Sequence, residues 1–265
     1  MTEKIKKYTY FASDFHLGAP DEIESLKREK EIIAWLNRIE LNASSIYLVG
    51  DIFDFWFEYK HVIPKGFSRL QGKIADLTDK GIPVHFFYGN HDMWMFDYFK
   101  KELSVEIHSD AIQIMIETKK IFVAHGDGLG PNDRGYKLIK KIFRFKLFQW
   151  LFARIHPNIG IKIAHYFSKK SRVKNGPRDA QFNGVENEWL YKFAQDYNKK
   201  NDIDFFVFGH RHLPLKISFD SATYINLGEW INYQTFGKFD GENFELLQWK
   251  NGGEDKYVTI PEKTK

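Results

Sequence analysis

Seven side chains of the types that bind metal ions follow short apolar runs in this sequence. They are two carboxylates, one amide and four imidazoles: Asp14, Asp51, Asn90, His16, His125, His210 and His212. The pairs Asp14/His16 and His210/His212 are each spaced two apart, so each pair would leave one face of a strand that continued through it. Seven ligands are too many for one small divalent ion. They suit two ions about 3.5–4 Å apart that share one carboxylate.

The donor set contains nitrogen and oxygen but no sulfur. It therefore favours Mn²⁺ first, with Fe²⁺, Zn²⁺ or Co²⁺ as alternatives, over Ca²⁺ or Mg²⁺. Two such ions clamp a phosphoryl group and activate water at neutral pH. Each motif alone has a plainer interpretation, since Gly89-Asn90 suits a turn and Gly209–His212 suits a solvated loop. Their joint occurrence, each after an apolar run, indicates the metal site.

The elements that must position these residues alternate between strands and helices. Helical periodicity is found over Asp21–Leu41 and Phe67–Lys80, and a third helix is expected near Val185–Lys200. This alternation predicts an α/β domain whose helices cover its sheets, with ligands on loops beyond the carboxyl ends of the strands. The sequence also predicts a hairpin within 111–124 and a series of short strands from Leu215 to Ile260. The apolar runs that precede the ligands are 8–13, 45–49, 84–88, 120–124 and 205–208.

The composition excludes several protein classes. The chain has 265 residues, of which 43% are hydrophobic and 28% charged, as in globular rather than disordered or collagen-like proteins. Cysteine is absent, which excludes disulfides and thiolate metal sites and favours a reducing compartment. No run of 18 apolar residues could span a bilayer, and no signal peptide precedes Tyr8. A cytoplasmic protein is therefore expected.

Positive charge is concentrated in one segment. Residues 134–178 hold thirteen Lys or Arg and no Asp or Glu, whereas the rest of the chain holds 26 basic and 35 acidic residues. This asymmetry predicts an anionic partner, which could be a phosphorylated substrate, an anionic lipid surface or nucleic acid. The basic residues alternate with aliphatic and aromatic bulk rather than lining a polar groove, so nucleic acid is not expected.

Five sequence blocks together resemble the signature of the calcineurin-like metallophosphoesterases. The resemblance implies a sandwich of two mixed β-sheets flanked by helices. It also implies that Asp14, His16, Asp51 and His212 hold one ion, while Asp51, Asn90, His125 and His210 hold the other. The blocks are Asp14-x-His16, Gly50-Asp51-x-x-Asp54, Gly89-Asn90-His91-Asp92, His125-Gly126-Asp127 and Gly209-His210-Arg211-His212.

The flanks of three blocks are similar to the UDP-2,3-diacylglucosamine hydrolase family of lipid A biosynthesis. These flanks are Asp14–Leu17, Gly50–Trp56 and His125–Gly130. The resemblance implies metal-dependent cleavage of the pyrophosphate bond of UDP-2,3-diacylglucosamine, giving UMP and 2,3-diacylglucosamine 1-phosphate, at the inner face of the bacterial inner membrane. It further implies a helical cap, placed here at 131–183, inserted between core segments 1–130 and 184–265.

The same resemblance assigns roles to individual residues. Asn90, His91 and Asp92 are the expected catalytic residues, with His91 assisting the leaving oxygen and Asp92 orienting it. His91 stands where the best-known branch of the family has Arg. The expected substrate contacts are Asn90, His91, Asp133, Tyr136, Ser171, Asn175, Arg178 and His210.

The basic segment is predicted to open with one amphipathic helix over Gly135–Ile155. Its basic stripe of Lys137, Lys140, Lys141 and Arg144 stands beside apolar and aromatic residues. Such a segment suits a diphosphate that carries two acyl chains, and it would also rest on an anionic membrane surface. The alternative is an ordinary helical subdomain that packs its own aromatics.

Several questions stay open from the sequence. Another metallophosphodiesterase or nucleotide pyrophosphatase with a soluble substrate, and a non-catalytic scaffold of the same fold, are the alternative functions. The sequence gives no indication of oligomeric state. Aromatic residues outside the basic segment either extend an acyl groove or belong to the core: Phe53, Phe55, Trp56, Phe57, Trp94, Phe96 and Phe99.

Overall fold

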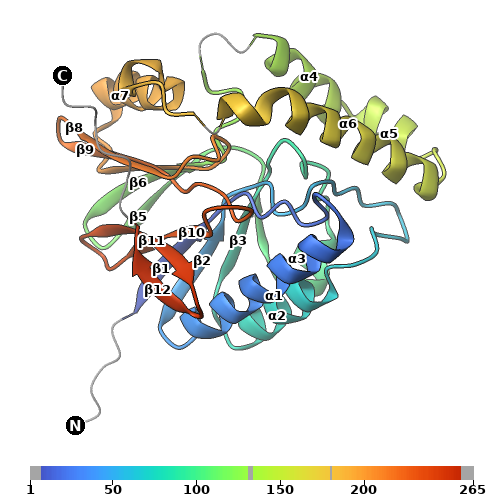
Figure 1. Cartoon of the computed structure of the whole chain (residues 1–265), viewed down its shortest axis with the longest axis horizontal. Coiled ribbons are helices and arrows are strands. Elements are labelled where there is room, and N and C mark those ends of the chain that lie inside the picture. The colour runs from blue at the N-terminus through green and yellow to red at the C-terminus, as the bar shows by residue number, and fades with distance from the viewer. Residues whose placement is uncertain (1–6, 131–133, 180, 258–265) are drawn as a thin grey trace.

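Two mixed β-sheets pack face to face, and the alternation of apolar side chains along their strands explains why (Figure 1). The computed structural model describes residues 7–130, 134–179 and 181–257, with the side chains of 134–136, 139 and 171–179 left out. Tyr47 and Phe87 of the first sheet meet Val123 and Val207 of the second in one buried cluster between the sheets. The sandwich expected from the sequence is confirmed.

The first sheet has seven strands, and its centre is parallel. β1, β2, β3 and β4 run in the same direction, while β10 and β11 are antiparallel to their neighbours. Parallel neighbours bring their carboxyl ends to one edge, where a site can form. Across the sheet the order is β12 (Gly253–Lys256), β11 (Phe244–Lys250), β10 (Thr235–Phe239), β1 (Tyr8–Ala12), β2 (Ala43–Leu48), β3 (Val84–Phe87) and β4 (Glu106–His108).

The second sheet has five strands and a parallel centre of its own. β6, β7 and β9 are parallel, and β5 and β8 close the two edges antiparallel to their neighbours. The carboxyl ends of β6 and β7 therefore lie side by side at one end of this sheet. The order is β5 (Ile112–Ile116), β6 (Lys119–Ala124), β7 (Phe205–Phe208), β9 (Ala222–Asn226) and β8 (Leu215–Phe219).

Helices cover the outer faces of both sheets. α1 (Glu22–Ile39), α2 (Ser68–Asp79) and α3 (Tyr98–Leu103) bury their apolar stripes on the first sheet. Asp21 caps α1, since its carboxylate accepts from the backbone N–H groups of Ile23 and Glu24 at 2.9 Å. The helix expected near 185–200 is a short 3₁₀ turn, η1 (Val185–Asn187), followed by α7 (Trp189–Asn201), which covers the second sheet.

Three further helices lie together beyond the edge of the sandwich (Figure 1). These cap helices are α4 (Arg134–Arg144), α5 (Lys146–Phe152) and α6 (Pro157–Asp179). The single helix expected over Gly135–Ile155 is wrong, because Phe145 has extended dihedrals (φ −75°, ψ 120°) and separates α4 from α5. Among the described residues, no helix is long and apolar enough to cross a bilayer.

Candidate metal centre and adjoining pocket

The loops that carry the candidate ligands are tied to one another through their backbones. The N–H of Asp14 donates to the carbonyl of Gly50 at 3.0 Å, and that of His16 donates to the carbonyl of Asp51 at 2.9 Å. In the second sheet, the N–H of Gly209 donates to the carbonyl of His125 at 3.0 Å. The ligand loops of each sheet therefore form a cross-linked unit rather than independent segments.

Five of the candidate ligands have left-handed backbone conformations, with φ between 44° and 67°. Non-glycine residues rarely adopt such angles, and they gather where function over-determines the backbone. β1 ends at Ala12 and β7 at Phe208. The strands therefore do not continue through the spaced pairs, and sharp turns position these side chains instead. The five are Asp14, His16, Asp51, His210 and His212.

Glycine at position 89 permits the close approach of two loops. A Cβ built on Gly89 would collide with the carboxylate and the backbone nitrogen of Asp51. Real Cβ atoms do not tolerate such contacts, so a side chain here would push the loop of Asn90 away from that of Asp51. The glycine in the Gly-Asn-His-Asp block is thus explained by packing at the site.

One group of four candidate ligands converges around Asp14 Oδ1. His212 Nε2 lies 3.2 Å and His16 Nε2 3.6 Å from that oxygen, and the two imidazole nitrogens are 3.1 Å apart. One ligand atom from each of Asp14, His16, Asp51 and His212 lies within 4.8 Å of every other. Among the described residues, the buried Asp14 Oδ1 has no hydrogen-bond partner. An ion among these atoms would supply what that oxygen lacks.

A second group shares the Asp51 carboxylate with the first. Asp51 Oδ2 lies 3.9 Å from His16 Nε2 and 3.5 Å from His125 Nε2, so the same oxygen faces both groups. His125 Nε2 is also 3.4 Å from Asn90 Oδ1, and the His210 ring lies 5.2 Å from that of His125. The carbonyl of Val49, 2.8 Å from His125 Nδ1, selects the tautomer that leaves a lone pair on Nε2.

Electrostatics of these groups point to a bound positive charge. Burial lowers the pKa of His16 and of His210 to about 4, which keeps both rings neutral and able to donate a lone pair. Although burial opposes it, the charge of Asp51 raises the pKa of His125 to about 10. Without an ion, the protonated His125 ring supplies the positive charge beside these carboxylates, and a divalent ion bound at Nε2 would replace that proton. The donor set of imidazole, carboxylate and amide oxygen fits such ions.

Asp92 supports a loop and does not orient His91 as expected. Its carboxylate accepts from the backbone N–H of Ile52 at 2.7 Å and of Gly89 at 2.9 Å. Burial raises the pKa of Asp92 to about 7, and the neighbouring Asp51 adds to the shift. These bonds hold the Asp51 and Asn90 loops in register, because one side chain spans both.

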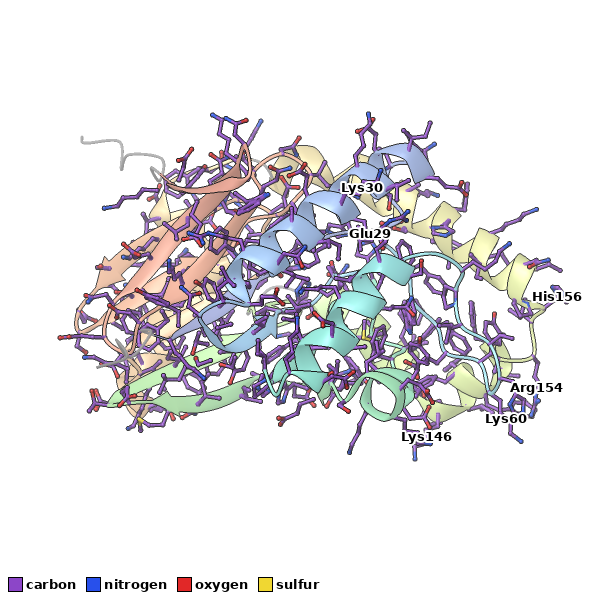
Figure 2. The ribbon with its side chains drawn as sticks, turned by 90° about the horizontal axis from the view of Figure 1, so that it is seen from below. Glu29, Lys30, Lys60, Lys146, Arg154 and His156 are labelled. Carbon is purple, nitrogen blue, oxygen red and sulfur yellow. The ribbon has the colours of Figure 1, made fainter. Side chains whose placement is uncertain are left out.

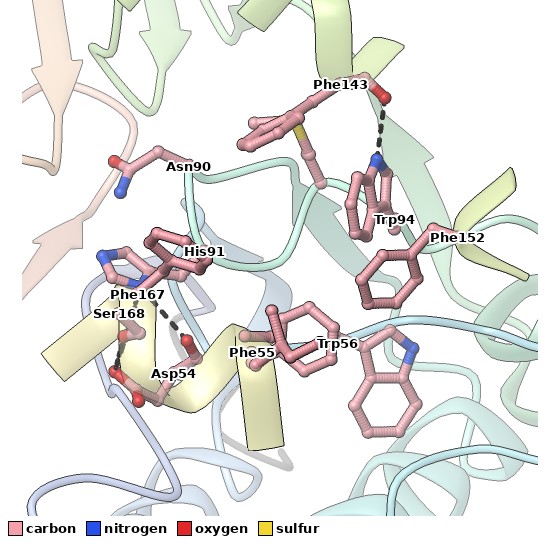
Figure 3. Close-up of a pocket in the computed structure, with 13 residues that line it drawn as sticks. Asp54, Phe55, Trp56, Asn90, His91, Trp94, Phe143, Phe152, Phe167 and Ser168 are labelled. Atoms are coloured by element: carbon pink, nitrogen blue, oxygen red, sulfur yellow. Dashed lines mark hydrogen bonds and ion pairs between the residues drawn. The ribbon is translucent and has the colours of Figure 1, made fainter. Parts of the chain in front are cut away.

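His91 is instead positioned by Asp54 and Ser168 (Figure 3). Its Nδ1 lies 3.1 Å from the backbone carbonyl of Asp54 and 3.0 Å from the Ser168 hydroxyl. Ser168 Oγ also donates to Asp54 Oδ1 at 2.8 Å. Asp54 belongs to the Gly50-Asp51-x-x-Asp54 block, which was a usable signal. Ser168, on cap helix α6, carried none.

An apolar cavity of about 580 Å³ opens beside His91 and Asn90 (Figure 3). Trp94 packs edge-on against Phe143 with ring centroids 5.4 Å apart, and its Nε1 donates to the Phe143 carbonyl at 2.8 Å. The wall therefore joins the core to cap helix α4. The remaining lining residues are Asp54, Phe55, Trp56, Met93, Phe152, Ile163, Ala164, Phe167 and Ser168.

The surplus aromatics divide between this cavity and the core. Phe53, Phe57 and Phe99 are buried core residues, and Phe96 is 42% exposed. Phe55 and Trp94 line the cavity, and Trp56 does so from a fully buried position. The core interpretation is therefore confirmed for the buried residues, and use of the cavity as an acyl groove stays a prediction.

Most of the expected basic stripe faces the core, contrary to its expected use on a lipid or diphosphate. Lys140 Nζ lies 2.6 Å from buried Asp127, and Arg144 lies 2.7 Å from Asp110. Lys137 donates to the carbonyl of Gly130 at 2.7 Å. The acidic core and the basic cap helices therefore neutralise each other here, while Lys141 stays exposed.

The expected substrate contacts on the cap fall outside what the structure describes. Asp133 lies outside the described residues. The backbones of Tyr136, in α4, and of Ser171, Asn175 and Arg178, in α6, are helical, but their side chains are not described. Their contacts with substrate therefore stay a prediction.

The chain is similar to known phosphoesterases. The family model described as calcineurin-like phosphoesterase matches residues 8–214. A protein of Porphyromonas gingivalis named UDP-2,3-diacylglucosamine hydrolase is 38% identical over 255 residues, covering 91% of this chain and 97% of its own. One of the same name from Histophilus somni is 27% identical over 229 residues, with coverages of 84% and 92%. Among solved structures, the phosphoesterase Yfce from E. coli is 16% identical, with a TM-score of 0.44 and coverages of 96% and 100%.

Proposed function

The chain belongs to the calcineurin-like phosphoesterase family, and we propose that it hydrolyses the pyrophosphate bond of UDP-2,3-diacylglucosamine. The products are UMP and 2,3-diacylglucosamine 1-phosphate, an intermediate of lipid A biosynthesis. The observation that carries the proposal is the apolar cavity directly beside His91 and Asn90. A soluble phosphodiester would gain nothing from it, whereas acyl chains would fill it.

The candidate ligands are proposed to hold two divalent ions in two groups that share Asp51. Asp14, His16, Asp51 and His212 hold one divalent ion, and Asp51, Asn90, His125 and His210 hold the second, with Mn²⁺ as the proposed ion. When bound, these ions supply charge stabilisation to the phosphoryl oxygens and a water activated at neutral pH. Asn90 and His210 also face the phosphoryl group.

His91 is the proposed acid for the leaving oxygen. Because the Ser168 hydroxyl and the Asp54 carbonyl both lie within hydrogen-bond distance of its Nδ1, the ring orientation is fixed. With Nδ1–H held by these oxygens, the ring would act as an acid in its imidazolium form, giving the Nε2 proton to the leaving oxygen. Asp92 contributes by holding the Asp51 and Asn90 loops together. Asp133, Tyr136, Ser171, Asn175 and Arg178 are proposed to contact the sugar and diphosphate.

The cap helices are also proposed to rest on an anionic membrane surface, which would place the enzyme at the inner face of the inner membrane. α5 exposes a contiguous run of apolar side chains, among them Leu147 (52%), Phe148 (44%) and Trp150 (53%). Lys146, Arg154 and His156 lie at the same end of the molecule (Figure 2). Cations beside exposed aromatics are typical of a helix that lies in the membrane interface. In these terms, 131–183 forms the cap and 1–130 with 184–265 the core.

The proposal is tested by comparing acylated and unacylated substrates. UMP release is measured from UDP-2,3-diacylglucosamine in detergent and from UDP-glucosamine, with the wild type and with Phe152→Asp. We expect the wild type to prefer the acylated substrate by at least about a hundredfold in kcat/KM, because burying one acyl methylene is worth about 0.8 kcal/mol. Phe152→Asp should lower only the acylated rate. Equal rates on both substrates would discard the lipid assignment.

A further inference from the structure

A second cluster of metal-ligating side chains lies at the edge of the first sheet, apart from the candidate centre. His85 stands on β3, and Glu106 and His108 stand on the edge strand β4. His85 pairs with Glu106 in the parallel register of these two strands. One ligand atom from each of the three residues lies within 4.8 Å of every other. No residue of this cluster belongs to the proposed dinuclear site.

Two of the three distances within the cluster are close to the edges of a zinc tetrahedron. Ligand atoms about 2.0–2.1 Å from a tetrahedral Zn²⁺ are about 3.3–3.4 Å from each other. His85 Nδ1 lies 3.2 Å from His108 Nε2 and 3.2 Å from Glu106 Oε2, and His108 Nε2 lies 3.8 Å from Glu106 Oε1. The two 3.2 Å spacings are close to that edge length, whereas the 3.8 Å spacing involves the other oxygen of Glu106. A turn of this exposed carboxylate would bring one of its oxygens into reach of both imidazoles, and water would occupy the fourth position.

Both imidazoles are held in place by neighbouring rings. His85 stacks on Tyr47 with ring centroids 4.2 Å apart and an interplanar angle of 6°. His108 packs on Phe87 at 4.8 Å. Burial lowers the pKa of His85 and of His108, which favours neutral rings. His85 Nδ1 and His108 Nε2 share a hydrogen bond, and a bound ion would take the place of its proton. Glu106 is 65% exposed, which leaves the cluster open to an ion from solution.

We propose that His85, Glu106 and His108 form a binding site for one zinc-class transition ion, additional to the two ions of the proposed centre. Two imidazoles and one carboxylate are a ligand set that Zn²⁺ uses in proteins. The ion would link the three-residue edge strand β4 to β3, because its ligands come from both strands. Because Ser109 and Asp110 follow His108 directly and both bind Arg144 of α4, it also stiffens the anchor of the cap helices.

The test counts zinc ions bound per chain. Full-length protein is dialysed against micromolar Zn²⁺, and bound metal is measured by mass spectrometry. We expect the wild type to hold one ion more than His85→Gln/His108→Gln. His61→Gln, which removes an exposed imidazole outside the cluster, should match the wild type and so excludes general surface binding. Because the result is a difference, it does not depend on how many ions the proposed catalytic centre holds.

A second variant keeps the test decisive if the double variant fails to fold. Glu106→Gln changes only an exposed carboxylate. Loss of a residue that merely supports a metal ligand weakens metal binding roughly 10- to 100-fold. Because Glu106 is a proposed ligand itself, we expect Glu106→Gln to weaken zinc binding at this site by at least that factor. Hydrogen exchange in β4 should slow when zinc is added to the wild type but not to Glu106→Gln. Equal zinc content in the wild type and in the folded variants would overturn the proposal.

Discussion

At the scale of single residues, side chains from distant parts of the chain hold the imidazole ring of His91 in one orientation. Ser168 lies 77 residues from His91 in the sequence, and its hydroxyl lies 3.0 Å from the imidazole Nδ1. It is 114 residues from Asp54, to which it donates. A cap helix thereby contacts the proposed acid directly, so the position of the cap helix and the orientation of the ring are linked.

Ser168→Ala should lower kcat on the acylated substrate about tenfold, since one neutral hydrogen bond is worth about 0.5–1.5 kcal/mol and each 1.36 kcal/mol is a factor of ten. The content of bound divalent metal should not change, because Ser168 is not a proposed ligand. Ser218→Ala, an exposed hydroxyl on β8, is the matched control. An unchanged kcat, or a loss of metal, would show that Ser168 does not act through His91.

Gly89→Ala should lower activity by about a hundredfold through displacement of the Asn90 loop, because small misplacements of reacting groups cost that much. The new methyl group would collide with Asp51. Gly72→Ala, in the middle of α2 with open space around it, is the control. It should raise the free energy of unfolding by about 0.5–1 kcal/mol. Full activity in Gly89→Ala, measured with its metal content, would refute the close approach.

At the scale of elements, the sequence predicted the ends of the parallel strands better than the turns beyond them. Runs such as Val84–Tyr88 end close to where β3 ends, because a buried strand must stop before the polar Gly89-Asn90. The left-handed turns at Asp14 and His210 could not be predicted, since contacts with other loops impose them. The break at Phe145 had no sequence signal either, because neither glycine nor proline marks it.

The sequence indicated the candidate metal ligands of the site, but it did not indicate the residues that hold the ligand loops in place. Asp14 and His125 stand in blocks whose residue types and order are specific. Arg28, which holds the loop of His16 by donating to the carbonyls of Phe15 and His16 at 2.7 Å, carried no local signal. Lys140 was correctly placed on a basic stripe, but the direction of the stripe depends on tertiary packing. Supports of this kind join segments that only the folded chain brings together.

Lys140→Met should loosen cap helix α4 and lower the free energy of unfolding by about 1–3 kcal/mol, because it removes a cation from buried Asp127. Although burial opposes it, His125 and Lys140 hold the pKa of Asp127 below its usual range. The stabilisation is therefore present above the ordinary carboxyl pKa of about 3.9 and is lost as the pH falls below it.

Urea unfolding and hydrogen exchange of α4 measure the effect of Lys140→Met. Lys141→Met is the control, since Lys141 is adjacent and exposed. It should change the free energy of unfolding by less than about 0.5 kcal/mol. Equal effects of the two substitutions would mean that the Lys140–Asp127 ion pair does not anchor the cap.

At the scale of the whole molecule, the distribution of charge and apolar surface supports the proposal that the cap faces a membrane. Several cap cations bind core groups, while α5 exposes aromatic and aliphatic side chains at one end. The apolar cavity lies between the cap helices and the core. The arrangement therefore supports transfer of a lipid substrate from a surface into the cavity beside the proposed ions.

Leu147→Asp should weaken binding to vesicles of phosphatidylglycerol and phosphatidylcholine by at least about tenfold, because a buried aliphatic side chain is worth about 1.5–3 kcal/mol. Vesicle co-sedimentation measures the affinity. Met115→Asp makes the same chemical change on β5 of the core, where Met115 is 59% exposed. It should bind vesicles like the wild type. Equal weakening by both substitutions, or no binding by the wild type, would contradict a membrane-facing cap.

We propose that the buried carboxylates and imidazoles bind divalent ions that are required for hydrolysis of the acylated nucleotide sugar. This proposal is tested most directly by UMP release from UDP-2,3-diacylglucosamine with protein stripped by a chelator and then supplied with Mn²⁺. We expect no turnover without metal and full recovery with Mn²⁺. We expect no recovery in Asp51→Ala, because the carboxylate that this substitution removes faces both ligand groups. Turnover that survives chelation, or recovery of full activity in Asp51→Ala, would contradict it.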